Sequence, residues 1–214
     1  MRFKSLSVLA VLLTYLIVGN FLHLVVFAAS PPDPNTFPVA GDVFGSEAEG
    51  FYQEITSVDA NRWVYARLTI VPGASGPPLH YHKQFEEHFI VESGTLSVQM
   101  SEGVVTIGPG ETLKVAPFTA HRPFNPGDKP VVIAGEGPVM PQSFAACLVQ
   151  LYPVLDTGGP GILFQMSVID PICDTHMADI PEAGMVVMRA VLGPLARLLG
   201  YRSYDPAKSL HPNG

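Results

Sequence analysis

Hydrophobic and polar residues divide the chain into three stretches with different patterns. In the first, no Asp, Glu, Lys or Arg occurs between Lys4 and Asp33, and residues 6–29 are almost entirely apolar. A helix needs about 20 apolar residues to cross a bilayer, whereas the apolar core of a signal peptide has about 7–15. For residues 1–30, this length favours an uncleaved transmembrane anchor over a signal peptide.

The flanks of the apolar stretch predict its orientation. Arg2 and Lys4 precede it and Asp33 follows it, so the positive-inside rule places the N-terminus in the cytoplasm. The small residues at positions 28–30 also suit a cleavage site, which leaves a cleaved signal peptide open. We therefore expect a membrane-anchored or secreted protein that is extracytoplasmic after this segment and contacts the membrane through residues 6–29.

The second stretch has the pattern of short β-strands. Residues 31–50 lead into it and begin with clustered prolines, which favour an extended linker. Within residues 51–138, apolar and polar side chains alternate over residues 95–100, as in a half-buried strand. Strand composition recurs in residues 62–71, 112–116 and 130–135.

Turn residues separate these strands. Ser93-Gly94 predicts a hairpin turn, and Gly108-Pro109-Gly110 has proline and glycine where a type II turn needs them. Many short strands joined by tight turns indicate a compact sandwich or barrel. The sequence therefore predicts an all-β fold for residues 51–138.

The third stretch, residues 139–214, loses the alternation and predicts a partly helical C-terminal extension. We expect two short elements around a turn in residues 144–170, and a helix over residues 184–201 with a break near Gly193-Pro194. This helix is apolar nearly all round. That pattern favours packing on the barrel or across a homodimer, and the alternative is a helix in the membrane interface whose arginines suit anionic headgroups.

Four side chains in the β-rich stretch could share one metal ion. His80 and His82 are two residues apart, so on a strand both face the same side. Glu87 alternates with two apolar residues and therefore points inward, where a carboxylate needs a partner. His121 follows a later strand and completes a set of three imidazoles and one carboxylate. Such a set suits a divalent Fe, Mn, Ni, Zn or Cu ion and leaves coordination positions open.

These residues resemble the two motifs of the cupin superfamily. His80-x-His82-x4-Glu87-x6-Gly94 is similar to the first motif, and Gly110-x5-Ala116-x4-His121-x3-Asn125 is similar to the second. The resemblance implies a double-stranded β-helix, or jelly-roll, barrel whose metal ligands are His80, His82, Glu87 and His121. In the second motif, Ala116 and Phe118 replace the proline and glycine that the family has before its last histidine.

Charge and cysteine content narrow the function further. The net charge is −7 and the chain has no basic run, so nucleic acid is a poor partner. Cys147 and Cys173 lie in mostly apolar stretches, which slightly favours two buried free thiols, although an oxidising compartment would let them pair. Asn125 precedes Pro126-Gly127, and we interpret it as a turn residue.

Three functions fit these features. The first is a metal-dependent oxygenase, oxidase or related enzyme that acts on a small polar or carboxylate substrate. The second is a non-catalytic module that binds a small ligand at the membrane. The third is a structural domain that retains an unused metal site, which the intact ligand set disfavours. The sequence assigns no residue as a catalytic acid or base.

Overall fold

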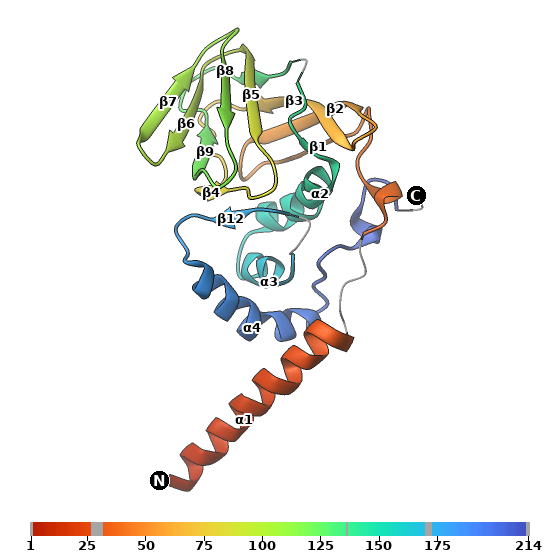
Figure 1. Cartoon of the computed structure of the whole chain (residues 1–214), viewed down its shortest axis with the longest axis vertical. Helices are drawn as coiled ribbons and strands as arrows, with labels where there is room; N and C mark the ends of the chain where they lie inside the picture. Colours follow the sequence, from red (N-terminus) through yellow and green to blue (C-terminus); the bar gives the residue numbers. More distant parts are fainter. Residues whose placement is uncertain (1, 27–31, 136, 170–172, 213–214) are drawn as a thin grey trace.

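The computed structural model describes residues 2–26, 32–135, 137–169 and 173–212. Its strands gather at one end, its C-terminal helices lie beneath them, and the first helix projects away from the rest (Figure 1). The helices are α1 (Arg2–Phe21), η1 (Leu22–Val26), η2 (Pro34–Thr36), α2 (Gln142–Thr157), α3 (Gly161–Val168), α4 (Glu182–Leu198) and η3 (Pro206–Lys208). The strands are β1 (Val43–Ser46), β2 (Phe51–Val58), β3 (Trp63–Ile70), β4 (His80–Tyr81), β5 (Glu87–Ser93), β6 (Leu96–Met100), β7 (Gly103–Ile107), β8 (Thr112–Val115), β9 (His121–Phe124), β10 (Val131–Ile133), β11 (Met140–Pro141) and β12 (His176–Met177).

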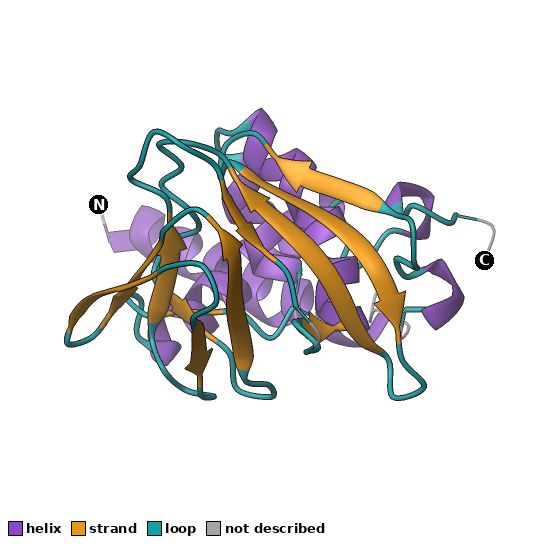
Figure 2. Ribbon diagram, turned by 90° about the horizontal axis from the view of Figure 1, so that it is seen from above, coloured by secondary structure: helices purple, strands orange, loops and turns teal. Residues whose placement is uncertain are grey.

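The strands form two antiparallel sheets that lie over a layer of helices (Figure 2). The first sheet has the order β1-β2-β3-β10-β5-β8, with β11 paired to β3, and the second has the order β12-β4-β9-β6-β7. Among the described residues, the ladders do not close into a continuous barrel. The apolar alternation of β5 and β6 buries Phe89, Val91, Leu96 and Val98 between the sheets, as the sequence predicts.

The predicted strand segments are confirmed, but one connection differs. Glu111 N donates to Gly108 O, and Gly110 has φ 83°, so the predicted turn there has type II features. The prediction of a hairpin at Ser93-Gly94 is wrong, because β5 and β6 belong to different sheets. Turn chemistry marks where a chain reverses, but only the packing of the two sheets decides which strands pair.

The C-terminal extension is helical, and short strands tie it to both sheets. β11 pairs with β3 and β12 with β4, so residues from the extension complete the edges of the β-rich part. The two elements expected around Gly158 are the helices α2 and α3. Phe144 and Ala145 of α2 pack with Ile55 and Val64 of the first sheet.

Two expectations for the extension are wrong. Cys147 and Cys173 form a disulfide with a Cα–Cα distance of 5.2 Å, because α2 brings Cys147 next to the loop before β12. The helix α4 also continues through Pro194 without a break. Proline lacks the N–H that would bond the carbonyl four residues earlier, Ala190 O, and that carbonyl instead accepts a hydrogen bond of 2.9 Å from Asn20 Nδ2 of α1.

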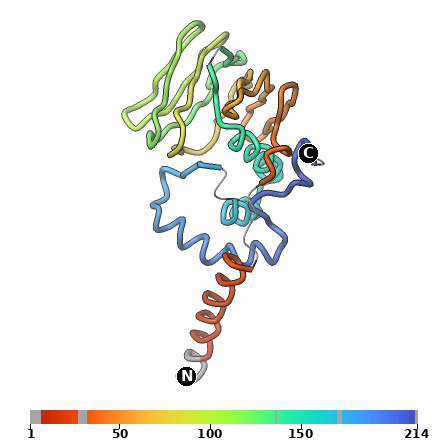
Figure 3. The backbone as a smooth tube through the Cα atoms, turned by 45° about the vertical axis from the view of Figure 1, so that its right-hand side comes forward, coloured from red at the N-terminus to blue at the C-terminus, as the bar shows by residue number. Residues whose placement is uncertain are grey.

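The N-terminal segment contains one helix long and apolar enough to cross a membrane, over Ser7–Val26. This helix, α1 with η1, projects from the body of the molecule and meets it at α4 (Figure 3). The potential cleavage site at positions 28–30 lies outside the described residues. The division of the chain at residues 30, 50 and 138 remains a prediction.

Candidate metal site

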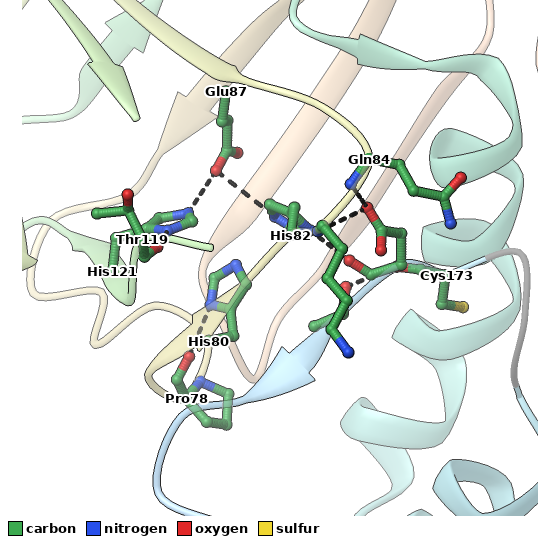
Figure 4. A network of polar contacts seen from close by, with 11 residues as sticks. Pro78, His80, His82, Gln84, Glu87, Thr119, His121 and Cys173 are labelled. Atoms are coloured by element: carbon green, nitrogen blue, oxygen red, sulfur yellow. Dashed lines mark hydrogen bonds and ion pairs between the residues drawn. The ribbon is translucent and has the colours of Figure 1, made fainter. Parts of the chain in front are cut away.

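Strand pairing brings three of the four predicted ligands together. In the second sheet, β4 pairs with β9 so that His80 lies directly opposite His121. His82 follows β4 by one residue, and Glu87 is the first residue of β5 in the other sheet. One ligand atom from each of the four side chains lies within 4.8 Å of every other. The site therefore sits where the two sheets meet (Figure 4).

Backbone carbonyls orient all three imidazoles in the same way. The Nδ1 atoms of His80, His82 and His121 lie 2.8 Å from Pro78 O, 2.8 Å from Asp174 O and 2.9 Å from Thr119 O. A carbonyl only accepts hydrogen bonds, so each Nδ1 carries a proton and each Nε2 is the ring nitrogen left to face the cluster. Ligand histidines in metal sites are fixed in this way by their second nitrogen.

One ring nitrogen is left without a partner. His82 Nε2 is buried and has no hydrogen-bond partner among the described residues, and it lies 3.7 Å from Glu87 Oε2. Leaving a buried polar atom unpaired costs about 1–3 kcal/mol. Ligands about 2.0–2.2 Å from one ion lie at most about 4.4 Å apart. The 4.8 Å limit on the spacing of the four ligand atoms is slightly wider than this, so the side chains would draw in by a few tenths of an ångström around an ion. The unpaired nitrogen of His82 fits a divalent metal ion.

Glu87 and His121 form a close ion pair within the cluster. Glu87 Oε2 lies 2.6 Å from His121 Nε2, and the side chains are 19% and 1% exposed. Burial opposes the charge on Glu87, but the hydrogen bond and charge of His121 outweigh burial and lower the pKa of Glu87 to about 2. Burial likewise opposes the charge on His121, and the same hydrogen bond raises its pKa. Glu87 therefore supplies a permanent negative charge.

The other two histidines are held neutral. Burial, followed by the nearby charge of His121, lowers the pKa of His80 to about 4. Burial also lowers the pKa of His82, whose ring stacks on Phe85 at a centroid distance of 4.3 Å. Metals bind the unprotonated imidazole. The buried environment of His80 and His82 therefore favours the protonation state that binds metal near neutral pH.

The C-terminal extension helps to position His82, which the sequence analysis did not anticipate. Asp174 accepts from His82 through its carbonyl, and its carboxylate accepts from the backbone N–H of Lys83 at 3.0 Å and of Gln84 at 2.7 Å. The preceding residue is Cys173, which lies beside the cluster (Figure 4). Its disulfide with Cys147 fixes this loop to α2. Positioning by a segment about 90 residues away leaves no local pattern in the sequence.

The outer face of β5 gives a useful contrast. Glu86 Oε1 lies 2.6 Å from His88 Nε2, and both side chains remain partly exposed at 41% and 20%. The expected alternation is thus confirmed, because Glu87 faces the cluster while its two neighbours face away. Asn125 is also a turn residue as predicted, since its side-chain amide donates to Ile70 O, Val71 O and Lys129 O.

The loop before His121 keeps its shape despite the missing glycine. Phe118 takes a left-handed backbone conformation with φ 64°, and its N–H donates to His82 O at 2.7 Å. A residue with a side chain is disfavoured there by about 1–2 kcal/mol. The departure from the motif therefore affects backbone strain and leaves His121 in place.

A cavity of about 250 Å³ opens beside His80 and Glu87. Its far wall comes from the C-terminal extension and consists of apolar side chains, among them Leu148, Leu151, Met166, Met177, Met185 and Met188. Methionine side chains are flexible and adapt to the shape of a ligand. The cavity thus has polar side chains at His80 and Glu87 and mostly apolar side chains where the helices line it.

Three further polar residues line this cavity: Glu49, Gln53 and Tyr152. Gln53 Nε2 donates to Tyr152 Oη at 3.3 Å. Burial, followed by the charge of Asp156, raises the pKa of Glu49 to about 7. A carboxyl group with such a pKa can exchange a proton near neutral pH. No local pattern in the sequence marks these residues. Tyr152, for example, reaches the cavity only because α2 packs beside it.

Comparison with known proteins identifies the class of the domain. Residues 66–134 match the family model of the cupin domain, so the chain contains a cupin domain. A sugar phosphate isomerase of Silicibacter pomeroyi is 20% identical, with a TM-score of 0.35 over 48% of this chain and 71% of that one. KdgF from Halomonas sp. is 20% identical, with a TM-score of 0.38 over 43% of this chain and 81% of that one.

An oxalate decarboxylase is 20% identical, with a TM-score of 0.36 over 50% of this chain and 31% of that one. No curated protein matches the chain. At these scores the similar structures do not assign an activity, so the function has to be argued from the site itself.

Proposed function

We propose that His80, His82, Glu87 and His121 hold one divalent metal ion and that the adjoining cavity binds a small molecule over it. The main support is the orientation of the histidines: all three Nδ1 atoms meet carbonyls, and the Nε2 atoms converge with a carboxylate. The donor set suits Fe, Mn, Ni, Zn or Cu.

We further propose that the protein is a metal-dependent oxidase or oxygenase that uses O2. The bound ion would supply open coordination positions and Lewis acidity. The residues of this chain would fix the ion, exclude water from the cavity and orient the substrate. Glu49 is our candidate for exchanging a proton with the substrate, because it lines the same cavity and its pKa lies near 7.

The lining of the cavity changes the expected substrate class. The sequence predicts a small polar or carboxylate substrate, but the side chains that the C-terminal extension contributes to the cavity are mostly apolar, with leucines and methionines among them. Such a lining favours a ligand with an apolar body, because apolar surface buried there contributes about 25 cal/mol per Å². We propose a substrate with one polar group near His80 and Glu87 and an apolar remainder.

Elemental analysis of the purified full-length chain tests the metal centre. We expect nearly one equivalent of metal in the wild-type protein and a large loss in His121→Ala. His88→Ala is the matched control, because His88 follows Glu87 on β5 but pairs with Glu86, outside the cluster. Equal metal content in wild type and His121→Ala, or no metal in either after metal-replete expression, would refute the metal centre.

A non-catalytic binding module is the alternative, and the nearly complete apolar lining of the cavity favours it. O2 consumption by the metal-loaded protein, measured with a panel of apolar alcohols, aldehydes and carboxylic acids, separates the two functions. Turnover of any member supports the enzyme. A rise in Tm with a panel member but without turnover supports the binding module, since a ligand that binds only the folded state stabilises it.

A further inference from the structure

The helix α4 has two chemically different faces. Met185 and Met188 face the cavity, and the helix packs along α3. On its other side, apolar side chains are exposed at a spacing of three or four residues: Val187 is 61%, Val191 43%, Leu195 37% and Leu198 83% exposed. Residues at this spacing share one face of a helix. An exposed apolar stripe of this kind marks an interaction surface.

The stripe is continuous with the candidate membrane span. α4 runs across the end of α1 that is nearer the body of the molecule (Figures 1 and 3). Side chains of α1 such as Val11 and Ile17, each 68% exposed, continue the apolar surface. The exposed stripe of α4 and the apolar side chains of α1 therefore belong to one surface.

Close packing fixes the crossing of the two helices. A Cβ at Gly19 would lie 3.0 Å from Pro194 Cβ, and a Cβ at Gly193 would lie 2.9 Å from His23 Nε2. Small residues at a helix crossing let the backbones approach, as in membrane helix pairs. Each helix thus has a glycine where the other helix comes nearest.

Hydrogen bonds join the helices at the same place. Asn20 Nδ2 donates to Ala190 O at 2.9 Å, and Tyr15 Oη donates to Val191 O at 2.6 Å. Ala190 O is the carbonyl that loses its helical partner to Pro194. An unpaired carbonyl is unfavourable in a hydrocarbon environment. The polar residue Asn20 of the apolar segment therefore has a structural role that requires α1 to stay attached.

We propose that α1 is retained as an uncleaved anchor and that the exposed face of α4 lies in the outer membrane–water interface, in contact with lipid. The crossing at Asn20 lies six residues before the end of the candidate span at Val26. At about 1.5 Å per residue, α4 then lies about 9 Å below that end. Interfacial helices bury their apolar face by about 5–10 Å. The contact depends mainly on apolar burial, since the chain as a whole is negatively charged.

This proposal does not rest on the metal centre. The cupin sheets lie at the far end of the molecule from α1, so the domain would stand on the membrane with α4 beneath it (Figure 1). Since the inner face of α4 lines the cavity, this helix would lie between the cavity and lipid.

Spin labelling of the full-length chain in phosphatidylcholine vesicles tests the placement of α4. The two native cysteines are paired, so a nitroxide attaches selectively to Val187→Cys. The matched control is Glu102→Cys, at the exposed turn between β6 and β7. We expect the label at position 187 to collide mainly with dissolved O2, which partitions into lipid, and the label at position 102 to collide mainly with a water-soluble nickel chelate.

Equal nickel accessibility at both positions would overturn the proposal by placing α4 in water. A label at position 187 that is shielded from both reagents and shows spin–spin broadening would overturn it too, because a second copy of the chain would then cover the stripe. Retention of α1 is tested by the intact mass of protein extracted from membranes. A mature chain that begins near residue 30 would overturn that part.

Discussion

Polar side chains lie between packed elements at both ends of the molecule, but they are arranged in opposite ways. At the crossing of α1 and α4, the donors Asn20 Nδ2 and Tyr15 Oη meet backbone carbonyls. At the junction of the two sheets, His82 Nε2 is buried beside Glu87 with no hydrogen-bond partner among the described residues. The first arrangement pairs its donors with acceptors of the chain, and the second gathers acceptors that suit a cation.

This difference separates structural from functional polar clusters. A polar group buried during folding normally finds a partner, because leaving it unpaired is costly. Where acceptors converge instead, as His82 Nε2 and the Glu87 carboxylate do, a bound cation would satisfy them. The helix crossing therefore explains stability, whereas the histidine cluster indicates binding.

The largest effect is expected for His82→Ala, which removes the ring nitrogen that lacks a partner. We expect almost complete loss of bound metal, more than the roughly 10–100-fold loss in affinity typical of a second-shell substitution. Metal content and a competitive chelator titration measure this. His176→Ala is a suitable control, because His176 is near the same loop but outside the cluster. Retention of metal in His82→Ala would mean that its unpaired nitrogen is no ligand.

Removing the disulfide is expected to affect both stability and the metal site. Cys147 and Cys173 are 26 residues apart, and a loop of this length corresponds to about 3 kcal/mol in the free energy of unfolding. Because Cys173 fixes the loop that holds His82, we expect the double serine variant to bind metal about 10-fold more weakly. Denaturant unfolding and metal titration measure the two effects. Lower stability with unchanged metal affinity would show that the loop does not position His82.

Glu49→Gln is expected to change how stability depends on pH. Burial, followed by the charge of Asp156, raises the pKa of Glu49 to about 7, so the folded state favours the protonated form. The wild type then loses stability as pH rises from the unfolded pKa of about 4.5 to 7, and the neutral Gln variant does not. We expect the variant to be about 1–2 kcal/mol more stable at pH 8 and equal at pH 4.

Thermal or urea unfolding at the two pH values checks this prediction. Glu47→Gln is the control, because Glu47 is exposed. A stability difference between Glu49→Gln and wild type that is the same at pH 4 and pH 8 would contradict a raised pKa.

The smallest effect is expected at the helix crossing. Asn20→Leu removes the donor to Ala190 O and should weaken the association of α1 with α4 by about 0.6–1.7 kcal/mol. Crosslinking between cysteines at positions 16 and 191 in vesicles would report it as a reduced yield. Metal content should stay unchanged, since the crossing lies at the other end of the molecule. Metal loss in this variant would contradict the separation of the two regions.

Much of the metal site follows from the sequence. Alternation alone put Glu87 on the inner face and Glu86 and His88 on the outer one, because successive side chains of a strand point to opposite sides. The motif spacing placed His80, His82 and His121, and the structure brings the same four side chains together. The apolar length of residues 6–29 likewise predicted a helix that can span a membrane.

Other features were decided only by the tertiary structure. The sequence predicted a break at Pro194, but Asn20, far away in the chain, satisfies the carbonyl that proline leaves unpaired. The pairing of Cys147 with Cys173 and the contact of Asp174 with His82 required α2 and the following loop to fold back onto the sheets. Local periodicity reports which side of an element is buried. It holds no information about which distant element covers that side, and that choice set the apolar wall of the cavity.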